Sequence, residues 1–196
     1  MTGIMKNDGE SAAEHEAQQR SPRMQKIVSE ARAMLREAGW GSISMRRLAA
    51  RLNVKAPSLY KHISGKEELL DLLLSESMAN LGARLHEAIA QEPSSAALLA
   101  AYREAALADP HGYHLMSRTR FVNAIEPSQL DTWIRGAFIK VAGSEAKGLA
   151  MWAFAHGLVT AELVQDLPPE FSATGESTSP AVDEIWEAGA AAFARP

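Results

Sequence analysis

Apolar residues recur at helical spacing along most of this chain. Over residues 23–38 they lie three and four positions apart, and Gly39 follows the last of them, as expected for an amphipathic helix that ends at glycine. A shorter run begins after Ser44, a good N-cap, and ends at Asn53, which tolerates the left-handed backbone of a tight turn. A longer run covers residues 69–90. Because few Val, Ile and Thr residues cluster as they do in strands, we predict an all-α fold.

The segment VKAPSLYKHISGKEELL, residues 54–70, predicts a third short helix and the start of the long one. Pro57 suits the first turn of a helix, where an N–H would have no partner, and Leu59 and Ile63 are spaced to face inward. Ser64-Gly65-Lys66-Glu67 has the spacing of a capping box at the start of the next helix. Three short helices, with a tight turn between the second and third, form the pattern of a helix-turn-helix.

Further helical stretches follow, most of them with proline near the start. We predict helices over residues 95–108, 110–117, 127–142, 145–167 and 180–194, and a loop over 168–179. Residues 1–20 hold no apolar stretch, which indicates a disordered tail and no secretory signal. The most membrane-like run, 148–164, contains His156 and Glu162, which favours a buried helix over a membrane span. We therefore expect a cytoplasmic protein, and the absence of cysteine fits a reducing compartment.

Charge is divided unevenly along the chain. Residues 21–66 hold ten basic and two acidic side chains, a net charge of +8, whereas residues 67–196 hold eight and eighteen, a net charge of −10. A cationic block attached to an acidic body is typical of a module that binds a polyanion. Basic and polar side chains gather on the second and third predicted helices and just after them: Arg46, Arg47, Arg51, Lys55, Ser58, Tyr60, Lys61, His62 and Lys66. Together with the helix spacing, they favour DNA as the polyanion.

The stretch SISMRRLAARLNVKAPSLYKHISGKEELLDLLL resembles the DNA-binding domain of TetR-family transcriptional repressors. The resemblance covers residues 23 to about 75, and its most specific part is Leu59-Tyr60-x-His62 followed by Lys66. It implies a dimeric repressor with two helical domains. A three-helix helix-turn-helix domain at residues 21–68 would bind operator double-stranded DNA. A larger helical domain at residues 69–196 would bind a small-molecule effector and mediate dimerisation.

The resemblance also implies roles for single residues. Tyr60, His62 and Lys66 match the family's phosphate contacts, and Lys66 lies where a cation can share an anion with amides at a helix N-terminus. The positions that match backbone-touching or base-reading residues are Ser44, Arg46, Lys55, Ala56, Pro57 and Ser58. The tetracycline-responsive members have a polar base-reading side chain at the position of Ala56. Alanine can contact a thymine methyl group but cannot donate a hydrogen bond, so we expect a different operator.

Several of these side chains could also have purely structural roles. Tyr60 would then cover an edge of the core, and His62 would cap the end of the short helix. Lys61 would be a solvated side chain or a nonspecific phosphate contact. Arg51 would pair with Glu30 or Glu37 of the first helix.

The acidic body gives weaker signals. Its Trp-x-x-x-His-Gly, within MWAFAHGLVTAEL, resembles a C-terminal domain subtype of some of these regulators, although Trp152 and His156 could equally belong to the core. The residues that would suit a pocket for a small organic ligand are Tyr113, Met116, Phe121, Trp133, Trp152 and His156. His111 and His114 lack a third metal ligand at definite spacing, so we expect them to cap a helix, and we expect neither a metal nor a cofactor. The helices at 145–167 and 180–194 are predicted to form a homodimer.

These observations predict a DNA-binding transcriptional regulator, and more narrowly a repressor that a small-molecule effector releases from its operator. The alternative is a DNA-binding dimer with a closed C-terminal domain and no effector, and nothing in the sequence separates the two. An enzyme is a remote alternative. The chain has no Gly-x-Ser-x-Gly, no phosphate-binding glycine loop and no His-Glu-x-x-His motif.

Overall fold

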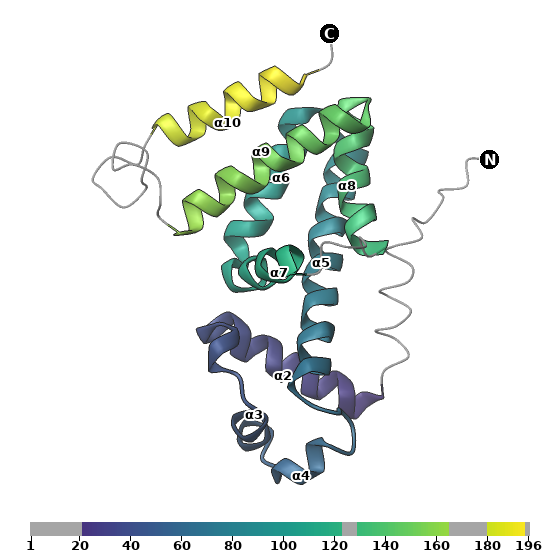
Figure 1. The fold of residues 1–196 in the computed structure, drawn as a ribbon, viewed down its shortest axis with the longest axis vertical. Coiled ribbons are helices and arrows are strands. Elements are labelled where there is room, and N and C mark those ends of the chain that lie inside the picture. Colours follow the sequence, from purple (N-terminus) through teal and green to yellow (C-terminus); the bar gives the residue numbers. More distant parts are fainter. Residues whose placement is uncertain (1–20, 123–128, 165–179, 195–196) are drawn as a thin grey trace, which may run out of the picture. The chain divides into compact units, whose positions relative to one another are not determined.

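The computed structural model describes residues 21–122, 129–164 and 180–194, and these residues form helices joined by short turns (Figure 1). No strand occurs among them, so the predicted all-α fold is confirmed. The predicted disordered tail, residues 1–20, and the predicted loop, residues 168–179, lie outside the described residues. Within the described part of the chain, no helix combines the length and hydropathy needed to cross a membrane.

Contacts divide the chain into two compact units. The N-terminal unit consists of Met1–Asn80 and Asp109–Leu130, and the C-terminal unit consists of Leu81–Ala108 and Asp131–Pro196. Helix α5 (Lys66–Gln91) supplies residues to both. The domain boundary predicted between residues 68 and 69 falls inside this helix, and it stays a prediction.

The N-terminal unit is built on a core of apolar side chains from five helices. Besides the first half of α5, these helices are α2 (Pro22–Ala38), α3 (Met45–Arg51), α4 (Ala56–Leu59) and α7 (Pro110–Val122). The fully buried members of this core include Ile27, Leu35, Leu48, Leu59, Ile63, Leu69 and Leu73. Burying one such side chain stabilises the fold by about 1.5–3 kcal/mol, so α3 and α4 are fixed mainly through their inward residues. In Figure 1, α3 and α4 lie side by side, at one end of the N-terminal unit.

Local capping explains where the first helices begin and end. The Ser44 hydroxyl accepts a hydrogen bond from the Arg47 amide at 3.2 Å, as predicted for an N-cap. Gly39 ends α2 with a positive φ of 69°, and its amide donates to the Leu35 carbonyl at 2.8 Å. Asn53 has a φ of 53°, which confirms the left-handed turn between α3 and α4.

Two predicted helices have different lengths in the structure. Helix α4 ends at Leu59, and residues 60–62 form a turn, although the Ile63 amide still donates to the Leu59 carbonyl at 3.0 Å. Helix α7 continues to Val122, beyond the predicted end at residue 117. The Ser117 hydroxyl donates to the Tyr113 carbonyl one turn earlier, at 2.9 Å, so this serine lies inside the helix and does not end it.

Helix α7 is attached to α2 and α5 by charged groups. The Arg32 guanidinium lies 2.6 Å from the Glu76 carboxylate and 3.9 Å from that of Asp109. Asp109 also accepts from the Gly112 amide at 3.1 Å, and so caps the start of α7. This carboxylate makes the cap that we predicted for His111 and His114.

The C-terminal unit packs α6 (Ser95–Ala108), α8 (Gln129–Ala142), α9 (Glu145–Val164) and α10 (Pro180–Phe193) with the last part of α5. Helix α10 lies along α9 and contacts α6 (Figure 1). The Arg103 guanidinium of α6 binds Glu162 of α9 at 3.1 Å and Asp183 of α10 at 2.6 Å. The Ser95 hydroxyl donates to the Ala190 carbonyl at 2.7 Å, so polar contacts tie these three helices together.

Candidate nucleic-acid interface

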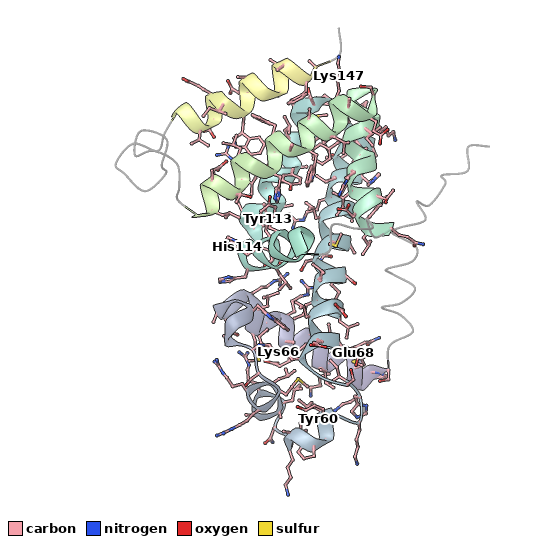
Figure 2. All side chains as sticks on the ribbon, viewed as in Figure 1. Tyr60, Lys66, Glu68, Tyr113, His114 and Lys147 are labelled. Atoms are coloured by element: carbon pink, nitrogen blue, oxygen red, sulfur yellow. The ribbon has the colours of Figure 1, made fainter. Side chains whose placement is uncertain are left out.

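The region around α4 combines a buried anchor with an exposed outer surface. Leu59 is fully buried and Ile63 is 1% exposed, whereas the Tyr60 side chain between them is 54% exposed. Figure 2 shows Tyr60 beside α4 at the end of the N-terminal unit. Its hydroxyl and the His62 ring make no hydrogen bond to another described residue. Both side chains are thus largely accessible to solvent, where a ligand could reach them.

The predicted DNA contacts share this end of the unit. Those whose side chains are exposed are Arg46, Lys55, Pro57, Tyr60, Lys61, His62 and Lys66, and those that are half-buried are Ser44, Ala56 and Ser58. Arg46, Lys55 and Lys61 form no ion pair with any other residue that the structure describes. Unpaired cations on one short stretch create a positive surface potential that attracts a polyanion.

Two arginines of α3 instead bind other groups within the chain. Arg51 forms ion pairs with both acidic residues that the sequence offered, Glu30 at 2.5 Å and Glu37. The hydrogen bond with Arg51 lowers the pKa of Glu37, and the same contact raises the pKa of Arg51. The Arg47 guanidinium donates to the Ser42 carbonyl at 2.6 Å. Arg46 is therefore the α3 arginine with no partner in the described structure.

The N-terminus of α5 is fixed by a carboxylate that the sequence analysis did not select. Because α5 begins at Lys66, its third residue is Glu68, one position beyond the predicted Glu67. Glu68 Oε2 accepts from the Ser64 amide at 2.6 Å and from the Ser64 hydroxyl at 2.7 Å. Both hydrogen bonds lower the pKa of Glu68, and the bond from the Ser64 amide has the larger effect. They hold the turn that connects α4 to α5.

Lys66 has a partner that sequence reasoning missed. Its ammonium nitrogen lies 4.6 Å from the centre of the Trp40 ring. Trp40 begins the short 3₁₀ helix η1 (Trp40–Ser42) and packs against the core of the N-terminal unit. The two residues are far apart in the sequence, so neither periodicity nor motif spacing could have indicated this contact.

This arrangement of short helices has a counterpart among known proteins. Residues 27–73 match the model of the family described as bacterial regulatory proteins, tetR family. These residues form a TetR-family helix-turn-helix domain.

A relative and two solved structures show how far the likeness extends. Over 49 residues the chain is 51% identical to an HTH-type transcriptional regulator of Saccharopolyspora erythraea, a match that covers 25% of this chain and 21% of that protein. The chain thus spans about a fifth of that curated relative's length. A bacterial regulatory protein in the tetR family from Rhodococcus RHA1 is 15% identical with a TM-score of 0.63, over 90% of this chain and 99% of that one. A TetR variant from Acinetobacter baumannii AYE in complex with minocycline is 18% identical with a TM-score of 0.52, over 86% and 97%.

At these low identities, the two structures concern the fold alone. They confirm the predicted fold class, an all-α chain in which a helix-turn-helix domain is followed by a larger helical domain.

Outside the TetR-family domain, two of the predicted ligand-binding residues lie together. In the C-terminal unit the Trp152 and His156 rings are stacked, with centres 5.3 Å apart. The His156 Nδ1 atom lies 3.3 Å from the Tyr102 hydroxyl, and the Arg135 guanidinium lies over the Trp152 ring at 5.3 Å. Aromatic faces beside polar groups would suit an organic ligand, but the same contacts also occur in a packed core.

The other predicted ligand-binding residues are more scattered. Tyr113 and Met116 are buried in the N-terminal unit, and the Phe121 side chain lies outside the described part of the structure. Trp133 stacks on His86 at 4.8 Å in the C-terminal unit. A pocket formed by all six residues stays a prediction. Among the described residues, no three His, Cys, Asp or Glu side chains gather as metal ligands would.

The contact between Glu68 and Ser64 predicts how stability depends on pH. Because the folded pKa of Glu68 lies below its usual value of 4.5, this contact stabilises the fold fully above that pH. The stabilisation is lost as the pH falls through the lowered pKa. We expect Glu68→Gln to reduce the free energy of unfolding by about 1 kcal/mol at pH 7 and to remove this part of the acid dependence. Urea unfolding between pH 7 and pH 3 measures both effects.

The exposed neighbour Glu67 provides the control. Glu67→Gln removes a carboxylate from the same helix turn without removing a hydrogen bond to Ser64, so its effect should be smaller. Equal losses in the two variants would show that the Ser64 contact contributes nothing beyond charge.

Proposed function

We propose that this chain is a transcriptional regulator of the TetR type, which binds operator DNA through α3, α4 and the N-terminus of α5. The observation that carries this proposal is the exposed cationic surface of the helix-turn-helix domain. Arg46, Lys55 and Lys61 have no acidic partner there among the described residues, although the chain as a whole carries a net charge of −4. Neutralising DNA phosphates would satisfy these charges and release counterions.

The exposed residues divide by the part of DNA that they would contact. Lys55, Ala56, Pro57 and Ser58 lie at the start of α4, and we propose that this end of the helix enters the major groove. We assign Arg46, on α3, to a base edge as well. The residues assigned to phosphates are Ser44, Tyr60, Lys61, His62 and Lys66.

We propose that the protein acts as a homodimer in the cytoplasm. The dimer would form through the C-terminal helices α9 and α10. Along α9, Ala150, Ala153 and Gly157 are exposed, and a Cβ atom at Gly157 would meet nothing within 4 Å. Small exposed residues would let a second helix approach closely. A twofold dimer would place two α4 helices in major grooves about 34 Å apart. A monomer in sedimentation equilibrium at micromolar concentration would contradict this assembly.

We propose further that the protein is a repressor released by a small organic effector. The stacked Trp152 and His156, with Tyr102 and Arg135 beside them, offer aromatic faces and polar groups for such a ligand. The A. baumannii TetR variant was solved with minocycline, and its fold is similar to this one. Helix α5 has residues in both units, so we propose that it transmits the effector's influence to the DNA-binding surface. The alternative is a closed dimerisation domain that binds no effector.

Mutations within the DNA-binding surface should separate base contacts from phosphate contacts. We expect Lys66→Ala to weaken binding to all duplexes alike and to reduce the slope of log affinity against log salt by about one. Arg46→Ala should instead reduce the preference for a selected duplex over a random one by about 1–3 kcal/mol, the value of a lost bidentate base contact. Ser58→Ala removes a single hydroxyl and should reduce the same preference by less. Fluorescence anisotropy with both duplexes at several salt concentrations measures these quantities. Equal losses on selected and random DNA in the Arg46 and Ser58 variants would contradict the base-reading assignment.

Thermal unfolding in the presence of small molecules should show whether the regulator binds an effector or has a closed C-terminal domain that binds none. An effector at a hundredfold its dissociation constant should add about 2.7 kcal/mol to the stability of the folded state. We expect at least one compound in a panel of metabolites and antibiotics to raise the unfolding temperature, and Trp152→Ala to reduce that increase. A compound that stabilises the protein and leaves its affinity for DNA unchanged would argue against effector release.

A further inference from the structure

Several hydrogen bonds stabilise the turn that carries Trp40. It begins at Gly39, whose positive φ of 69° suits glycine, and the Ser42 hydroxyl donates back to the Gly39 carbonyl at 2.8 Å. The Ile43 amide donates to the Trp40 carbonyl at 3.1 Å, and Arg47 holds the Ser42 carbonyl at 2.6 Å. The indole is half-buried and packs against the core of the N-terminal unit. Hydrogen bonds at both ends of its turn and packing of the indole against the core therefore hold Trp40 in place.

Lys66, by contrast, has no fixed support apart from this ring. It is exposed, it is the first residue of α5, and it makes no ion pair with another described residue. A lysine side chain has several rotatable bonds, and the partial positive charge of the helix N-terminus repels its ammonium group. The distance of 4.6 Å from the Trp40 ring centre is within the range at which a ring face attracts a cation. The ammonium group thus lies over the indole, beside the end of α5.

We propose that Trp40 is a positioning residue for the contact between Lys66 and a DNA phosphate. This inference rests on the proposed DNA-binding function and adds a residue to it. With one side of the ammonium group against the indole, its remaining N–H donors face solvent, where a phosphate could bind them together with the first amides of α5. Because the side chain is already confined, it loses less freedom when the phosphate binds.

Binding of the full-length chain to a random-sequence duplex tests this role, because a phosphate contact does not depend on sequence. We expect Trp40→Leu, which keeps an apolar side chain against the core, to weaken binding about two- to fivefold. Trp40→Phe keeps a ring face and should restore most of the affinity. In a Lys66→Ala background, Trp40→Leu should have no further effect, since the cation that it positions is gone.

A measurement on the free protein tests the geometry without DNA. Protons on the Lys66 side chain should resonate upfield in the nuclear magnetic resonance spectrum because they lie over the indole. The Lys66→Ala variant identifies these signals, and Trp40→Leu should move them to the position of a solvated lysine. Circular dichroism and thermal unfolding of each variant check that the helical fold is retained.

The outcomes distinguish a Trp40 that positions Lys66 from a Trp40 that only stabilises the fold. Loss of affinity in Trp40→Leu that requires Lys66, with rescue by phenylalanine, supports the proposal. An equal loss with and without Lys66 would mean that Trp40 only stabilises the fold, and no loss, or no upfield shift, would also overturn the proposal. If the unaltered protein bound no DNA at low salt, the proposed function itself would fail.

Discussion

Burial of Leu59 and Ile63 fixes the position of α4, because a helix of only four residues has no stability of its own. Both side chains enter the core that α2, α3 and α5 build, and the backbone bond from Ile63 to Leu59 keeps them on one face. The three side chains between them then face outward, whereas Val54 and Ala56 before them pack against the same core. The exposure of Tyr60, Lys61 and His62 follows from this anchoring, and so does the position of Lys55 at the start of the helix.

Ion pairing decides which cations of the domain can bind a second molecule. Arg51 is neutralised by Glu30 and Glu37 of α2, so its contribution to an external anion is weakened. Arg46 and Lys61 have no such partners within the described residues. Lys66 lies on an aromatic ring instead of a carboxylate, an arrangement that orients its charge and preserves it. The N-terminal unit is thus held together by apolar burial and local caps, and the unpaired cations Arg46, Lys55 and Lys61 lie on or beside α3 and α4.

Much of this organisation could be predicted from the sequence because it depends on short-range physics. Gly39 and Asn53 have the backbone conformations that their residue types favour, and α6 has the bounds that its apolar spacing indicated. The errors concern the exact ends of helices. Helix α5 begins at Lys66, so Glu68 and not Glu67 makes the cap. The Ser117 hydroxyl bonds to the preceding turn of α7, and the helix continues past it. The contact between Trp40 and Lys66 joins residues distant in sequence, which no local pattern encodes. Which residues of the C-terminal unit bind a ligand depends on tertiary packing, so residue types alone give only candidates.

We propose that residues 44–66 form the DNA-binding surface of this chain. Hydrogen–deuterium exchange of the full-length protein, with and without a duplex selected from a random pool, tests it most directly. We expect slower amide exchange in peptides covering residues 44–66 when DNA is bound, with little direct change in residues 145–164 of α9 and 180–193 of α10. Protection confined to α9 and α10, or exchange in residues 44–66 that DNA leaves unchanged despite measurable binding, would contradict it.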